Sequence, residues 1–225
     1  MYRYSLCKML FAMLVALVSA TPNAFADLII SFGPSNGLNS GPISFLEGQE
    51  SKLNVLIQRD SAQTPPLESF TVWVNLERIS GLNPNGLLFA TTQQESQLNS
   101  PNYVFNNVSS GLIGTVENSG LQYQGTDTTT ANNAVTVPQS NRLLFSLDVS
   151  PIAQGEYRIS VSAANSSFIS PDFNSIPFTS SPGTISVTAV PEPSSLFILM
   201  VAIGVAAVPC SRRMLVLRKC ARQTN

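Results

Sequence analysis

The sequence predicts an all-β protein, an antiparallel β-sandwich between a secretory signal peptide and a C-terminal membrane-spanning segment. Four stretches in the middle of the chain alternate apolar and polar residues with a period of two. Clusters of glycine, proline, asparagine and serine separate them, and no stretch there has the 3.6-residue period of an amphipathic helix. Alternating strands have one buried and one solvated face, so several of them in one domain indicate two packed antiparallel sheets.

Residues 1–26 have the three parts of a secretory signal peptide. A basic start precedes the apolar residues 9–20, and Ala24 and Ala26 supply the small-x-small pattern that signal peptidase requires. The apolar stretch is too short for a comfortable membrane span. We expect signal peptidase to cut after Ala26, and an uncleaved N-terminal anchor is the alternative.

Residues 27–189 are the predicted exported domain. They contain no cysteine, so neither a disulfide nor a thiolate can form there, and about 160 residues are enough for one hydrophobic core. The domain carries five basic and twelve acidic residues, a net charge of −7, without a basic cluster. This charge repels phosphate backbones, so we expect no nucleic-acid partner.

Ten segments of this domain have strand character. The alternation is clearest at 51–58, 69–76, 142–150 and 157–163. Shorter strands are expected at 27–32, 87–90, 103–105, 111–116, 134–137 and 184–189. Residues 126–133, TDTTTANN, indicate a surface loop.

The residue types of the exported domain offer little chemistry. The chain has no histidine, which removes the commonest general base and the commonest metal ligand. A glycosidase needs only two facing carboxylates, and Glu68 with Glu77 or Asp148 with Glu156 are the pairs to consider, but nothing selects either. We therefore expect no enzyme and no cofactor. Calcium, which takes oxygen ligands, stays open although no EF-hand-type loop occurs.

Three aromatic residues could contact a glycan. Trp73 alternates with the apolar residues of 69–76 and so belongs to the polar face of that strand, where either a loop covers it or a partner reaches it. Tyr103 and Tyr123 lie in polar surroundings in the sequence, and each fits a peripheral core position equally well.

The chain ends in three segments of different character. They are a Pro-Glu-Pro box at 190–193 (Val190, Pro191, Glu192, Pro193), an apolar segment at 194–211, and a basic end at 212–225 that opens with Arg212 and Arg213. The prolines keep the box extended. The uncharged run 196–208 would span roughly 20 Å as a helix, short of a bilayer core of about 30 Å. We expect a short transmembrane helix with the basic end in the cytoplasm and the domain outside.

The order and spacing of these segments, together with the signal peptide, resemble the PEP-CTERM sorting signal. The resemblance implies a Gram-negative, exopolysaccharide-producing bacterium, in which an exosortase, a membrane peptidase, recognises the box at the inner membrane. It further implies that the tail is processed and the protein released to the cell surface or the extracellular matrix. The ending MLVLRKCARQTN is longer and more apolar than this family usually shows. An ordinary C-terminal anchor is the alternative.

The stretch LLFSLDVSPIAQGEYRISVSA, residues 143–163, is similar to cohesin-like and related carbohydrate-binding sandwiches. This resemblance implies a cohesin-like or jelly-roll sandwich, and a shared fold does not by itself deliver a function. Two functions follow from the sequence as hypotheses. One is a non-enzymatic surface or matrix protein associated with exopolysaccharide or biofilm, and the other is a carbohydrate-binding module that docks onto polysaccharide. A carboxylate-dependent hydrolase is the outsider.

Overall fold

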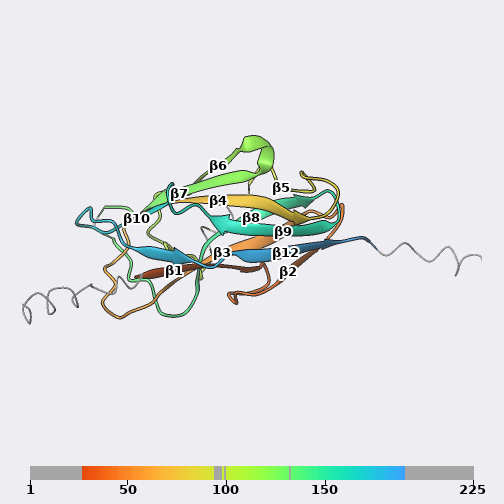
Figure 1. The fold of residues 1–225 in the computed structure, drawn as a ribbon. Coiled ribbons are helices and arrows are strands. Elements are labelled where there is room, and N and C mark those ends of the chain that lie inside the picture. The colour runs from red at the N-terminus through yellow and green to blue at the C-terminus, as the bar shows by residue number, and fades with distance from the viewer. Residues whose placement is uncertain (1–26, 94–97, 99, 132, 191–225) are drawn as a thin grey trace, which may run out of the picture.

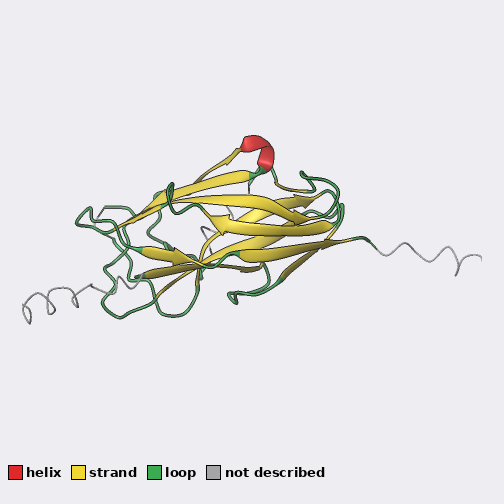
Figure 2. Ribbon diagram, viewed as in Figure 1, coloured by secondary structure: helices red, strands yellow, loops and turns green. Residues whose placement is uncertain are grey.

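The structure, a computed structural model, describes residues 27–93, 98, 100–131 and 133–190. These residues form a sandwich of strands, which includes a turn of 3-10 helix, η2 (Asn118–Gly120) (Figure 2). The strands are β1 (Leu28–Pro34), β2 (Ile43–Leu46), β3 (Ser51–Arg59), β4 (Ser69–Ser80), β5 (Leu87–Phe89), β6 (Ile113–Glu117), β7 (Gln122–Thr128), β8 (Arg142–Pro151), β9 (Gly155–Val161), β10 (Ser167–Ile169), β11 (Phe178–Ser180) and β12 (Gly183–Thr188).

The strands lie in two packed sheets (Figure 1). One has five strands in the order β11-β1-β3-β8-β5. The other has seven, in the order β2-β12-β9-β4-β7-β6 with β10 added beside β4. The predicted all-β sandwich is therefore confirmed for the exported domain.

Most neighbouring strands are antiparallel, as the alternation predicted, but two edge pairs are parallel. The first strand of each sheet in chain order runs beside a late strand, β1 beside β11 and β2 beside β12. The chain switches sheets between β1 and β2, so the N-terminal region contributes one strand to each layer. Alternation within one strand does not reveal the direction of its neighbour, which is why the sequence could not predict these two pairs.

The core fills the space between the sheets with aromatic rings. Phe145 of β8 lies between Phe70 of β4 and Tyr123 of β7, with ring centroids 6.2 and 5.3 Å apart, so these contacts join the two layers. Gly125 faces the same ring, and a Cβ there would come within 3.0 Å of it. One pair is stacked and the other tilted, and aromatic rings at such distances bury large apolar areas.

The four clearest strand predictions are confirmed, and their apolar faces point inward. Phe70, Val72 and Val74 are buried on β4 while Thr71 and Trp73 between them are not. The prediction is wrong at 103–105 and 134–137, which contribute only isolated bridges. It is also wrong in part at 126–133, because 126–128 belong to β7. β2, β7, β10 and β11 were not predicted.

Both predicted membrane-related segments lie outside the described residues. The signal peptide at 1–26 and the tail from Pro191 onward, with its expected transmembrane helix at 194–211, are not described. In the part of the chain that is described, no helix has the length and apolar character needed to cross a bilayer.

Candidate functional site

The broad outer face of the seven-stranded sheet carries the one predicted glycan contact that stays near the surface. Trp73 lies on β4 and is half-buried. The neighbouring turn holds its backbone, because Trp73 N–H donates to Ser166 Oγ at 2.9 Å and Ser162 N–H donates to the Trp73 carbonyl at 2.9 Å. Trp73 is therefore fixed in position, with part of its indole covered and part accessible.

Amides and hydroxyls surround Trp73 on this face. The antiparallel register places Gln124 of β7 opposite Trp73 and Thr115 of β6 opposite Gln124. In the next row, Thr126 Oγ1 donates to Thr71 Oγ1 at 3.2 Å across the strands. Directly opposed side chains in an antiparallel pair share one face, so these groups form one polar surface around the indole.

Asn75 follows on the same face, with Gln122 and Ser160 as its cross-strand partners. Its Oδ1 is buried and has no hydrogen-bond donor among the described groups. Further along, Glu77 pairs with Arg158 at 3.8 Å, and both side chains are largely exposed. Such an exposed pair contributes little to stability and leaves charges of both signs at this end of the face.

Tyr103 and Tyr123 are both 1% exposed, so neither ring is available to a glycan. The prediction of a glycan contact at these two residues is wrong, and the alternative of a core position holds. Tyr123 packs against Phe89 and Phe145. Tyr103 packs against Phe105 at an interplanar angle of 80°, the edge-to-face arrangement that aromatic pairs favour.

The hydroxyl of Tyr103 donates a hydrogen bond to a buried carboxylate, an interaction that the sequence did not predict. Asp127 on β7 is 2% exposed and accepts hydrogen bonds from the hydroxyls of Tyr103 and Ser109. The N–H of Thr128 also donates to its Oδ1 at 2.7 Å. A buried charge needs such donors, because desolvation is costly. Burial and the hydrogen bond to Asp127 both raise the pKa of Tyr103 well above its ordinary value.

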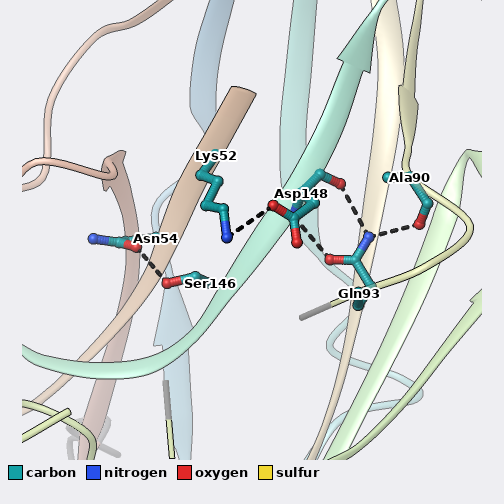
Figure 3. A network of polar contacts seen from close by, with 6 residues as sticks. All are labelled: Lys52, Asn54, Ala90, Gln93, Ser146 and Asp148. Carbon is teal, nitrogen blue, oxygen red and sulfur yellow. Dashed lines mark hydrogen bonds and ion pairs between the residues drawn. The ribbon is translucent and has the colours of Figure 1, made fainter. Parts of the chain in front are cut away.

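The outer face of the five-stranded sheet carries a second polar network (Figure 3). Lys52 on β3 lies opposite Asp148 on β8 and pairs with it at 3.2 Å. The side chain of Gln93 accepts from Asp148 N–H at 2.8 Å and donates to the Asp148 and Ala90 carbonyls at 3.0 and 2.7 Å. Gln93 thus replaces a strand residue beside β8, where β5 has already ended (Figure 3). This network stabilises the edge of the sheet.

Neither nominated carboxylate pair has the geometry of a glycosidase. Glu68 and Glu77 are nine positions apart on or beside one strand, roughly 30 Å at strand rise, whereas hydrolysis needs carboxyls about 5–9.5 Å apart. Asp148 and Glu156 point outward from different sheets, since their chain neighbours Val149 and Tyr157 are buried. Among the described residues, no group of three or more acidic, histidine or cysteine side chains could hold a metal ion.

The predicted sorting box begins where the sandwich finishes. β12 ends at Thr188, and Val190, the first residue of the box, is exposed. Of the predicted site residues, Val190 is the only member of the tail that the structure describes. Ala24, Ala26, Pro191, Glu192, Pro193, Arg212 and Arg213 lie outside the described residues.

No protein-family model matches the chain, and no curated protein matches it. Several solved structures share its architecture. The OlpC cohesin of Clostridium thermocellum, in complex with the dockerin Doc435, has a TM-score of 0.51 at 8% identity and covers 76% of this chain and 99% of that one. A cohesin module from a family 33 glycoside hydrolase of Clostridium perfringens has a TM-score of 0.51 at 9% identity, covering 74% and 100%.

The third cohesin of ScaC from Acetivibrio cellulolyticus, in complex with the ScaB dockerin, has a TM-score of 0.50 at 16% identity and covers 72% of this chain and 99% of that one. At these identities the likeness concerns the fold. The described domain has a cohesin-like β-sandwich fold, and the fold class predicted from the sequence is confirmed.

Proposed function

We propose that this chain is an exported, non-catalytic surface or matrix protein that carries a PEP-CTERM sorting signal and is associated with exopolysaccharide. Signal peptidase removes residues 1–26, and the tail holds the protein at the inner membrane. An exosortase-type peptidase then acts at the box 190–193 and releases the sandwich to the cell surface or matrix of a Gram-negative bacterium. Two of the three similar cohesins hold dockerins, so in those proteins this fold is a docking module.

One observation carries the proposal. The sandwich finishes its last strand at Thr188, and the box starts two residues later at an exposed position. Cleavage at the box would therefore remove none of the core that the structure describes, because its last buried apolar residue is Val187. The absence of histidine from the chain and the separation of the nominated carboxylates support the non-catalytic part.

A two-tag experiment tests the sorting proposal. One tag is inserted after Ser40, in the exposed part of the loop between β1 and β2, and the other follows Asn225. In cells that contain the processing peptidase, the first tag should reach the surface or matrix and the second should be lost from it. A Glu192→Ala variant should retain both tags on one membrane-bound chain. If the unmodified chain keeps both tags in such cells, it has an ordinary anchor.

The second candidate function, carbohydrate binding, is favoured by the polar face around Trp73. A partly accessible indole beside the side-chain amide of Gln124 suits a sugar ring, which stacks on an aromatic face and hydrogen-bonds at its edges. A pull-down of residues 27–190 on the host's own exopolysaccharide tests it. Trp73→Ala should abolish retention, while Thr115→Ala, in the same row of the sheet, should leave most of it. Equal retention by both variants would reject a glycan site at Trp73.

A further inference from the structure

The end of the sandwich at which β12 finishes is built from three loops (right side of Figure 1). Residues 46–50 include the last residue of β2 and the loop after it, residues 81–86 follow β4, and residues 151–155 include the connection from β8 to β9. Glu47 N–H donates to the Thr188 carbonyl at 2.9 Å, which ties the first loop to the last residue of β12. The last strand and these loops therefore form one surface.

This surface collects exposed apolar side chains. Seven large apolar residues are exposed in the described part of the chain, and five of them lie here. These five, which we call the apolar tip, are Leu46, Ile79, Leu82, Ile152 and Val190. Leu82, the second residue of its loop, is completely exposed. Single exposed apolar residues are ordinary, but a cluster at one end marks a contact surface.

The loops that present the apolar tip are tightly held. The Gly86 carbonyl accepts from Ile152 N–H at 2.6 Å and from Ala153 N–H at 2.9 Å, which joins the second loop to the third. Gly48 N–H donates to the Pro151 carbonyl at 2.7 Å and joins the first to the third. Gly81 has a φ of 111°, and a Cβ there would come within 2.7 Å of a backbone carbonyl, so only glycine fits. The exposed side chains therefore project from a fixed frame.

A groove of about 680 Å³ lies between these loops, and Leu82 and Ala189 are among its lining residues. Two carboxylates, Glu47 and Glu156, also line it. The surface thus combines apolar side chains with negative charge. Negative charge is repelled by anionic lipid headgroups and tolerated by zwitterionic ones.

The C-terminal tail of the chain indicates that this surface lies close to the membrane. Ala189 lines the groove, and the uncharged run begins seven residues later at Leu196. Seven residues reach about 25 Å at most when fully extended. If the run lies in the membrane, as the proposed function holds, this end of the sandwich is confined close to the bilayer. The opposite end, where Phe173 lies between β10 and β11, carries no such tether once signal peptidase has removed residues 1–26, as the proposed function holds.

We propose that the apolar tip rests in the interfacial layer of the bilayer while the tail is attached, and so fixes how the box is presented. This inference rests on the proposed function. A weak contact suffices, because the tether gives the tip a high effective concentration at the membrane. Once the tail is cut, the loss of the tether and the negative charge of Glu47 and Glu156 favour release of the domain from the membrane.

A fluorescence experiment on the chain with its tail tests this contact. In a chain of residues 27–225, which lacks Cys7, with the substitutions Cys210→Ser and Cys220→Ser, a polarity-sensitive probe is attached at Leu82→Cys. The protein is then reconstituted into phosphatidylcholine vesicles. The matched control carries the probe at Phe173→Cys, which is also an exposed apolar loop residue but lies at the other end. The probe at 82 should show blue-shifted emission and be quenched by spin-labelled lipid, and the probe at 173 should show neither.

Vesicles with added phosphatidylglycerol test the charge argument. The blue shift at 82 should shrink in them, and Glu47→Gln with Glu156→Gln should restore it. If the emission of the probe at 82 indicates an aqueous environment in both vesicle types, the inference is wrong. The inference is also wrong if aqueous quenchers and spin-labelled lipid both fail to quench the probe at 82. A protein surface, such as a second copy of the chain, would then cover the probe.

Flotation of the same samples separates the two proposals. A chain that floats with the vesicles while its probe at 82 stays in water retains the membrane-held tail and refutes only the tip contact. A chain that fails to float contradicts the membrane-held intermediate, and the tip contact falls with it.

Discussion

Tyr103→Phe removes the hydroxyl that donates to the buried carboxylate of Asp127 and changes little else in the shape of the side chain. The ring of Tyr103 is 1% exposed and keeps its edge-to-face contact with Phe105 after the substitution. Asp127 keeps its bonds from Ser109 and Thr128 but loses one of three donors. The substitution therefore measures one hydrogen bond to a buried charge.

The expected cost follows from the acceptor. A hydrogen bond to a charged group contributes about 1.5–3 kcal/mol, against about 0.5–1.5 kcal/mol for a neutral pair. In a domain of this size, each kcal/mol lowers Tm by about 2–4 °C. We expect Tyr103→Phe to lower the unfolding free energy by about 1.5–3 kcal/mol, and Tm by about 3–12 °C.

Urea unfolding of residues 27–190 measures this, with fluorescence of Trp73, the only tryptophan in the chain, as the probe. Tyr157→Phe is the matched control, because its hydroxyl donates to the neutral carbonyl of Ala153 at 3.2 Å. The control should cost clearly less. Equal losses in the two variants would refute the reasoning that Asp127 is held as a buried charge by Tyr103.

Three further predictions concern the stability of the sandwich. Phe145→Ala removes the central ring of the aromatic contact between the sheets. It should lower the free energy of unfolding, measured with urea, by about 3–5 kcal/mol. A decrease below about 1 kcal/mol would contradict the central place of Phe145 in the core. Gln93→Ala removes three side-chain hydrogen bonds, whereas Lys52→Ala breaks a partly exposed ion pair that contributes about 0–1 kcal/mol. Gln93→Ala should therefore lower Tm more than Lys52→Ala. The reverse order would contradict the role given to Gln93 in the network. The pKa of Tyr103 is raised in the folded state, so its contribution is complete below the ordinary value of 10.0 and is lost as pH rises above it. The unfolding free energy from urea titrations should therefore fall from pH 9 to 11, less steeply in Tyr103→Phe, and identical slopes would contradict the buried hydroxyl.

The sequence predicted the strands whose buried residues are apolar at every second position. β4 is the clearest case, with Phe70, Val72 and Val74 inward and Trp73 outward. β7, QYQGTDT, was missed because its inward positions hold Tyr123, Gly125 and Asp127, which do not form an apolar row. The glycine is needed for the close approach of Phe145, and the aspartate is compensated by donors from distant loops.

For the candidate site, the sequence could predict only which face of its strand a residue occupies, because this follows from the alternation of apolar and polar residues. Alternation placed Trp73 on the polar face correctly, but Tyr103 is outside any strand, so no periodicity indicated which way it points. Its burial depends on contacts with Phe105 and Asp127, and Asp127 is 24 positions away along the chain. The apolar tip could not be predicted either, since its residues come from four separate segments.

The most direct test of the account is the intact mass of the protein recovered from the cell surface or matrix, compared with the membrane fraction of the same cells. The account predicts a matrix form that starts at Asp27 and ends at or close to the box 190–193. It also predicts a membrane form that retains the tail to Asn225. A matrix form that still contains the apolar run 196–208, or a protein found only as the full-length membrane form, would contradict it.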